Sequence, residues 1–334
     1  MINKSSIEKD IHNMIQITNN ISAIFLLICL LTNQSNAQML DKGIQYYDSG
    51  ALDKAKVTLK RIQKDQQDFH RASFYLGRIA FDKEDYDAAE EYFEEAIDAN
   101  DRVSDYHLWL GNTYGVVARD ANVFKQGFLA PKIKNSYEKA VELDDRNIDA
   151  LSGLVQYYTR APGFMGGSWE KGLQMAEKIF LVDPAKGHSA RATVYLSQEK
   201  YTLAENEYIK AAKLSDDKIL NLGYFYRKRE QYNKAFDTYE RLMNSDDLRV
   251  IALYQIGKTS ALSGEKSVLG IESLQEYLKA EPEENQQNHA FALMRLGMIY
   301  EKIGDKKIAK SYYSQSLVKN PKQEEAKKGV NRLQ

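Results

Sequence analysis

The chain has 334 residues, 43% of them hydrophobic, with 46 basic and 47 acidic side chains and a formal net charge of −1. This balance excludes the strongly basic character of a general nucleic-acid-binding protein, so no nucleic acid is expected among its partners. The single cysteine, Cys29, lies near the amino end, so packing and not disulfides has to stabilise the remainder of the chain.

The amino-terminal residues have the pattern of a secretory signal. An apolar run, Ile21–Leu31, is too short to span a bilayer and is followed by the small residues of a cleavage site at Ser35-Asn36-Ala37. We predict that residues 1–37 form a signal peptide, that cleavage leaves Gln38 as the first residue, and that no transmembrane span then remains. The expected location is periplasmic or secreted. The start codon stays open, since a start at Met14 would remove the charges that precede the run.

Glycine recurs at an interval of 34 residues, at positions 43, 77 and 111 and again at 223 and 257. The clearest unit, Phe69–Asp101, holds two apolar stripes at helical spacing that are separated by the polar turn Asp82–Asp85. A period in the thirties with two helical stripes per unit indicates stacked helix hairpins, each of which buries its apolar face against its neighbours. The sequence therefore predicts an all-α repeat protein.

This unit resembles the tetratricopeptide repeat. It carries the small and aromatic residues of that repeat in the same order, at Leu76, Gly77, Tyr86, Ala89, Phe93 and Ala96, while Ala80 and Asp101 depart from the usual aromatic residue and proline. The resemblance implies a right-handed superhelical solenoid of about eight helix-turn-helix repeats over residues 38–321, with a concave groove that binds a partner. The tail, residues 322–334, is expected to form a capping helix.

Two neighbouring units are longer than the period. About ten residues are added near residues 119–134 and about five near residues 161–169, and we expect both additions to form loops on one edge of the stack. Their apolar side chains are candidates for a ligand site: Phe124, Phe128, Phe164, Met165 and Trp169. The favoured interpretation is that the aromatic residues pack the two long loops together, because large apolar side chains in ordered loops are usually buried.

The resemblance also implies which residues bind a partner, since the first helix of each pair lines the groove in this family. The positions that flank the Leu-Gly pair are Arg71, Phe74, Arg78, Asn112, Gln156, Arg160, Tyr224, Arg227, Lys228, Tyr254 and Lys258. Among them, Arg227, Lys228 and Lys258 alternate with two tyrosines, a composition suited to an acidic, extended segment through charge-assisted hydrogen bonds and ring contacts. The alternative is that these are ordinary solvated side chains.

No pattern of residues predicts catalysis. The five histidines are scattered without the spacing of metal ligands, and no nucleophile-elbow or phosphate-binding glycine motif is present. We therefore expect no catalytic residues, no metal and no cofactor. The predicted function is a noncatalytic scaffold that binds a protein or peptide segment in the cell envelope. The alternative is an enzyme, or an accessory subunit of one, that acts on envelope glycans or peptides at the inserted loops. The partner's identity and the oligomeric state stay open.

Overall fold

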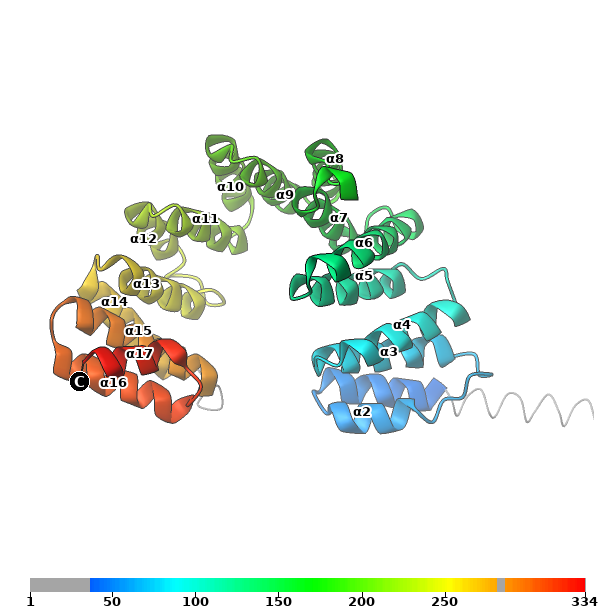
Figure 1. Ribbon diagram of the computed structural model, residues 1–334, viewed down its shortest axis with the longest axis horizontal. Coiled ribbons are helices and arrows are strands. Elements are labelled where there is room, and N and C mark those ends of the chain that lie inside the picture. Colours follow the sequence, from blue (N-terminus) through cyan, green and yellow to red (C-terminus); the bar gives the residue numbers. More distant parts are fainter. Residues whose placement is uncertain (1–36, 281–285, 334) are drawn as a thin grey trace, which may run out of the picture. The chain divides into compact units, whose positions relative to one another are not determined.

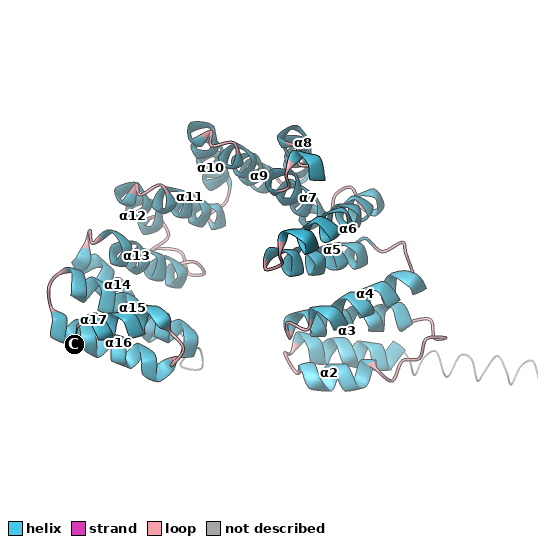
Figure 2. Cartoon of the chain, in the orientation of Figure 1, coloured by secondary structure: helices cyan, strands magenta, loops and turns pink. Residues whose placement is uncertain are grey.

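The computed structural model describes residues 37–280 and 286–333, and every regular element in this part of the chain is helical (Figures 1 and 2). The predicted signal peptide, apart from its last residue, lies outside the described residues. None of the helices in the described ranges is long and apolar enough to cross a membrane.

The helices follow one another with short connections. In chain order they are a helix over residues 37–48, α2 (Leu52–Leu59), α3 (Phe69–Asp82), α4 (Tyr86–Ala99), α5 (Ser104–Arg119), α6 (Val123–Leu143), α7 (Ile148–Arg160), the 3-10 turn η1 (Gly163–Met165), α8 (Trp169–Val182), α9 (Pro184–Ser197), α10 (Tyr201–Leu214), α11 (Asp217–Lys228), α12 (Tyr232–Glu240), α13 (Arg249–Ser263), α14 (Ser267–Ala280), α15 (Gln286–Lys302), α16 (Lys306–Lys319) and α17 (Glu324–Arg332). Within each compact part of the chain, consecutive helices pack on one another, with α7 against α6 and α8 against α9. The predicted all-α fold of about eight helix-turn-helix repeats is confirmed.

The chain divides into two compact units. The amino-terminal unit extends to Gly167 and the carboxy-terminal unit begins at Ser168, so the boundary falls in the enlarged turn of the fourth repeat. Within the amino-terminal unit, α3 packs on α4, α5 on α6, and α6 contacts both α7 and η1. Within the carboxy-terminal unit, α8 packs on α9, and the hairpins from α9 to α16 stack in order.

Most hairpins close around the glycine of their first helix; the α9–α10 hairpin has Ala192 at that position, and Gly153 of α7 faces Tyr137 of the preceding helix. A Cβ atom added to Gly77 would lie 2.6 Å from the ring of Phe93, and one added to Gly297 would lie 2.7 Å from the ring of Tyr313. The facing residue is sixteen positions after the glycine in both pairs, which places it on the second helix. Glycine is required here because the two helix axes approach so closely that a side chain would overlap the ring.

The turns of the regular hairpins share a left-handed residue. It stands seven positions after the repeat glycine and has a positive φ at Gly50, Glu84, Glu230, Gly264 and Gly304. A left-handed residue ends the first helix and reverses the chain, so the second helix can start at once. The third and fourth repeats have no positive φ at this position, and these are the two repeats with added residues.

The residues added to the third repeat are helical. The loop expected near residues 119–134 is wrong, because α6 begins at Val123 and continues for 21 residues. The Asn122 side chain accepts a hydrogen bond from the Lys125 backbone and caps the helix start. Gly111 still faces Tyr137, which is 26 positions later, so the additional length lies in the amino-terminal part of α6.

The residues added to the fourth repeat form a compact turn around η1. The backbone nitrogens of Gly166 and Gly167 donate to the carbonyl oxygens of Gly163 and Pro162, at 2.9 and 3.1 Å. A Cβ atom on Gly167 would overlap the Ala161 backbone, which explains the glycine at that position. Near the carboxy-terminal end, α17 lies in the segment that was expected to form a capping helix, and it packs on α16.

Replacing Gly77 by leucine should destabilise the protein by at least about 1–3 kcal/mol, because the new side chain would overlap the Phe93 ring. Urea unfolding followed by circular dichroism measures this as a lower midpoint. Gly163→Leu is the matched control, since nothing lies within 4 Å of a Cβ atom at that position. Equal midpoints for the two variants would contradict the close approach of α3 and α4.

Candidate partner-binding site

Three positions from successive repeats meet on the first helices of the hairpins. Arg78, directly after the repeat glycine, has its guanidinium 3.7 Å from the ring centre of Trp109 in the next repeat and 5.4 Å from that of Tyr47 in the preceding one. Trp109 stands two positions before its own glycine, and Tyr47 stands four positions after its own. The same three positions in other repeats are therefore expected to lie close together.

In the amino-terminal unit this arrangement encloses a cation in aromatic rings. The Arg78 guanidinium lies against the rings of Trp109 and Tyr47, and the ring centre of Phe74 is 5.9 Å from the guanidinium. The ring faces carry negative electrostatic potential, so they stabilise the guanidinium without a carboxylate. Tyr47 in turn donates a hydrogen bond of 2.7 Å to Asp82. The rings therefore offset the charge at this position, although the buried Nε of Arg78 has no hydrogen-bond partner.

In the carboxy-terminal unit the same three positions hold only cations. Lys258 follows the glycine of α13, Arg227 stands four positions after the glycine of α11, and Arg295 stands two positions before the glycine of α15. Burial, followed by the positive charges of Arg227, Arg295 and Lys228, lowers the pKa of Lys258 to about 8. We call Arg227, Lys258 and Arg295 the cationic cluster.

The cationic cluster has unused hydrogen-bond donors. Arg227 is only 7% exposed, and its buried Nη1 has no hydrogen-bond partner. The guanidinium lies near the Tyr239 hydroxyl, and its charge opposes the rise that burial causes in the pKa of that hydroxyl. The buried Nε of Arg295 is also without a partner, and its Nη1 contacts the Met298 sulfur at 3.2 Å. Buried donors of this kind are costly unless another group binds them, so the arrangement suits an anionic ligand.

No carboxylate among the described residues pairs with the cluster. Glu301 occupies in the last repeat the position that Arg227 has in its own, but it accepts two hydrogen bonds of 3.0 Å from Arg332 of α17. These hydrogen bonds from Arg332 hold the pKa of Glu301 below its usual value. The acidic side chain at the end of the stack is therefore already bound.

Two tyrosines that were predicted from the sequence flank the cluster. Tyr224 is 50% exposed, and both Arg227 and Lys228 lie beside its ring, at 5.5 and 5.7 Å from the ring centre. Tyr254 is half-buried, with its ring 5.2 Å from that of Tyr277. The structure thus brings the predicted Arg227 and Lys258 together. Arg295 was missed, although alignment of the repeats on their glycines would have placed it beside Lys258.

Other residues predicted for the groove have different surroundings. Phe74 was wrongly assigned to an open surface: it is 8% exposed and packs its ring on Phe93 and Tyr106, because it lies one helical turn before the glycine on the face toward the hairpin partner. Asn112 accepts a hydrogen bond of 2.8 Å from the Tyr137 hydroxyl. The remaining predicted residues, Arg71, Gln156 and Arg160, are exposed.

The aromatic residues of the two additions are not packed together. Phe124, Phe128 and Phe164 of the amino-terminal unit are 90%, 66% and 86% exposed, and Trp169, the first residue of α8, is 53% exposed. The interpretation that these side chains bury one another is therefore wrong. Met165 is half-buried, with its methyl carbon against the Gly127 position.

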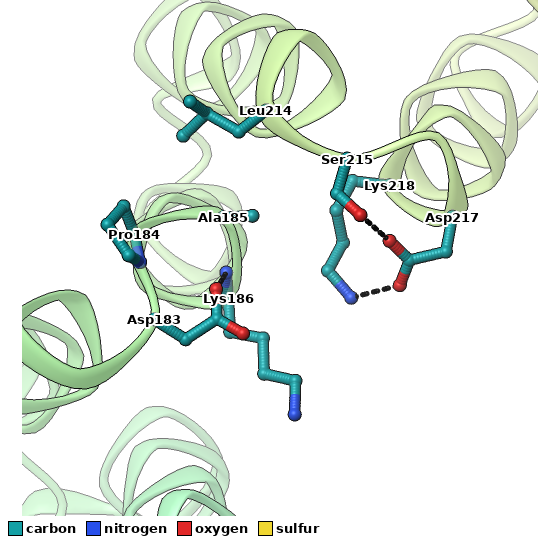
Figure 3. Close-up of a pocket in the computed structure, with 8 residues that line it drawn as sticks. All are labelled: Asp183, Pro184, Ala185, Lys186, Leu214, Ser215, Asp217 and Lys218. Atoms are coloured by element: carbon teal, nitrogen blue, oxygen red, sulfur yellow. Dashed lines mark hydrogen bonds and ion pairs between the residues drawn. The ribbon is translucent and has the colours of Figure 1, made fainter.

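A separate cavity of about 490 Å³ lies between the start of α9 and the start of α11. Figure 3 shows that its two carboxylates are already bound: Asp183 caps α9 through the Lys186 backbone nitrogen, and Asp217 binds both Ser215 and Lys218. The cavity therefore offers few unused polar groups, in contrast to the cationic cluster. No set of three His, Cys, Asp or Glu side chains in the described ranges could hold a metal ion.

Lys258→Met should increase the stability of the protein at pH 7, because it removes a buried charge that neighbouring cations disfavour. The pKa of Lys258 is lower in the folded state than in the unfolded state. The charged lysine therefore destabilises the folded state by a constant amount below pH 8, and this destabilisation disappears as the pH rises through 8 toward 10.5. The gain in urea midpoint over wild type should therefore shrink between pH 8 and 10. The exposed Lys310→Met should show no such trend, and a constant gain for Lys258→Met would contradict the assignment.

Comparison with known proteins agrees with this geometry. Two segments, residues 40–112 and 291–322, match family models described as tetratricopeptide repeat. Superkiller complex protein 3 of Mus musculus is 28% identical over 158 residues, or 47% of this chain and 10% of that protein. Tetratricopeptide repeat protein 37 of Xenopus laevis is 21% identical over 299 residues, or 86% of this chain and 18% of that protein. The chain thus spans less than a fifth of the length of these relatives.

Solved structures of repeat proteins are also similar. A tetratricopeptide repeat protein from Parabacteroides merdae has a TM-score of 0.47 at 17% identity, covering 79% of this chain and 98% of that one. YrrB, described as a tetratricopeptide repeat protein with an unusual peptide-binding site, has a TM-score of 0.38 at 17% identity, covering 73% and 100%. Residues 40–112 and 291–322 thus match tetratricopeptide repeats, and the helix hairpins of both segments close around a repeat glycine in the same way.

Proposed function

We propose that this protein is a noncatalytic scaffold that binds an extended acidic segment of a partner protein on the cationic cluster of its carboxy-terminal unit. The observation that carries the proposal is the buried Nη1 of Arg227, which has no hydrogen-bond partner, beside Lys258 and Arg295. Carboxylates would satisfy the free donors and offset the repulsion that lowers the pKa of Lys258. Proteins built from these repeats generally act as interaction scaffolds, which supports the noncatalytic assignment.

The cluster suits an extended ligand because its members come from three successive hairpins, on α11, α13 and α15. Packed helices such as α13 and α15 lie about 8–10 Å apart. A polyproline-type segment advances about 3.1 Å per residue and repeats its orientation every three residues. Acidic side chains at every third position would therefore reach successive cations, while the rings of Tyr224 and Tyr254 contact the segment between them.

The charge of the whole protein supports a local site. The net charge is −1, so the chain as a whole has no excess of positive charge that would attract anions in general. Such a chain has little general attraction for nucleic acid, and a short acidic protein segment is the partner that we propose. The affinity should fall steeply as the salt concentration rises, because charge-assisted contacts at a partly open site are screened.

A 12-residue fluorescein-labelled peptide with glutamate at every third position should bind the full chain, as measured by fluorescence anisotropy. The variant Arg227→Gln/Lys258→Gln/Arg295→Gln should bind at least about tenfold more weakly, since each charge-assisted hydrogen bond contributes about 1.5–3 kcal/mol. The control Lys306→Gln/Lys307→Gln/Lys310→Gln changes the net charge equally at exposed residues of α16 and should bind within about twofold of wild type. Equal losses in both variants, or binding of a glutamine version of the peptide, would refute the site.

The affinity for the same peptide should fall as the pH rises from 8 to 10, because Lys258 loses its proton in this range when the site is empty. Lys258→Arg keeps the charge at higher pH and should retain its affinity up to pH 10. If wild type and Lys258→Arg lose affinity in parallel, Lys258 does not contribute a titrating charge to binding.

We also propose that the protein acts in the cell envelope of a Gram-negative-type bacterium, as a periplasmic or secreted protein. The support is the apolar run and the small residues that end at Ala37. Mass spectrometry of the protein purified from the cells that produce it should identify an amino-terminal peptide that starts at Gln38. A mature chain that begins at Met1 or Met14 would contradict export by cleavage.

A further inference from the structure

A group of apolar side chains projects from the amino-terminal unit at the place where the repeat period is broken. Val123, Phe124 and Phe128 of α6 are 72%, 90% and 66% exposed, and Phe164 of η1 is 86% exposed. We call these four residues the aromatic tip. Its side chains are distinct from the cationic cluster, and the proposed function makes no use of them. Apolar side chains that are so fully exposed usually mark an interaction surface.

The structure holds the aromatic tip in place. α6 contacts η1, and the Met165 methyl carbon lies 3.6 Å from the Cβ position of Gly127, so the turn rests on the helix. The Tyr157 hydroxyl donates a hydrogen bond to the Met165 carbonyl oxygen, and hydrogen bonds within the turn add to its order. Phe164 thus projects from an ordered turn. This turn contacts α6, and Phe124 projects from the first turn of that helix.

Carboxylates beside the aromatic tip are paired with basic side chains. Glu90 lies 3.0 Å from the Lys132 ammonium, which is 5.3 Å from the Phe128 ring centre. Residues 121–128 and 161–167 contain no aspartate or glutamate. Lys125 and Arg160 are exposed and have no carboxylate partner among the residues that the structure describes. The nearest acidic side chain in sequence, Asp120, is already paired with Arg119 at 3.0 Å. A ligand for this surface should therefore be apolar in its interior and negatively charged at its boundary.

We propose that the aromatic tip inserts into the interface of an anionic lipid bilayer and attaches the scaffold to a membrane surface. Four projecting side chains fall short of the roughly 20–30 residues per side of a standard protein interface. A lipid surface accepts separate projecting rings without a matching pocket, and Lys125 and Arg160 can stay at the headgroups. The negative boundary that the charges require is then supplied by anionic lipid.

A fluorescent reporter tests local insertion in the full chain. Phe124→Cys is combined with Cys29→Ser and labelled with NBD, and vesicles of phosphatidylglycerol and phosphatidylcholine are added. The NBD emission should shift to the blue, and the shift should be much smaller with pure phosphatidylcholine vesicles or in high salt. Val318→Cys in the same background is the control, because Val318 is 81% exposed on α16 and should show no shift. No shift at position 124, or equal shifts at both positions, would overturn the proposal.

The same reporter distinguishes the other occupants. A blue shift without vesicles that grows with protein concentration would show that a second copy covers the tip, and the lipid proposal would be wrong. Binding through the apolar run at residues 21–31 alone would carry the chain to vesicles without a shift at position 124, which would also overturn it.

Unlabelled variants provide the second measurement. Vesicle flotation with the anionic mixture measures the apparent affinity for the bilayer. Phe124→Ser/Phe164→Ser should lower this affinity at least about tenfold, because two large apolar side chains no longer enter the interface. Val268→Ser/Val318→Ser removes two equally exposed apolar residues elsewhere and should bind like wild type. Both variants should keep the wild-type circular dichroism, since all four replaced side chains are exposed. A loss that is equal in the two variants would contradict the proposal.

Discussion

The architecture depends on one contact, the approach of a ring or branched side chain to the glycine of its own hairpin. Gly77 with Phe93 and Gly297 with Tyr313 show the contact at opposite ends of the described chain, with the same spacing of sixteen positions. The missing side chain allows the two helices to pack closely, and the ring fills the space between them. Because the hairpins that carry this glycine are closed in the same way, the faces that their first helices present to the partner keep the same register.

That constant register lets different side chains create different sites on the same scaffold. Around Arg78 the neighbouring repeats contribute Trp109 and Tyr47, and the rings compensate the charge. Around Lys258 they contribute Arg295 and Arg227, and the charges repel each other. The helix packing is alike in the two places, and the difference adds the cost of a repelled charge at Lys258. What it changes is the surface, which in the carboxy-terminal unit has a positive charge that no carboxylate of the described chain neutralises.

The two irregular repeats follow from the loss of a turn residue. A left-handed residue ends the first helix at Glu84 and Gly304, and the third and fourth repeats have none at this position. The added residues of the third repeat extend α6, and those of the fourth form η1. Large apolar side chains in these additions find no neighbours to bury them, because the hairpin core is already filled by Gly111 and Tyr137. They remain exposed as the aromatic tip.

The sequence by itself determined the fold class, because the spacing of glycine, alanine and aromatic residues specifies which faces of the helices must pack. It also placed Arg227 and Lys258 on one surface. Only the tertiary structure decided that Arg295 completes the cluster, that Phe74 is buried, and that Phe124 and Phe164 are exposed. The reason is physical: periodicity describes packing within a repeat, whereas burial and electrostatic coupling depend on side chains that neighbouring repeats bring within a few ångströms, and an insertion can extend a helix as readily as a loop.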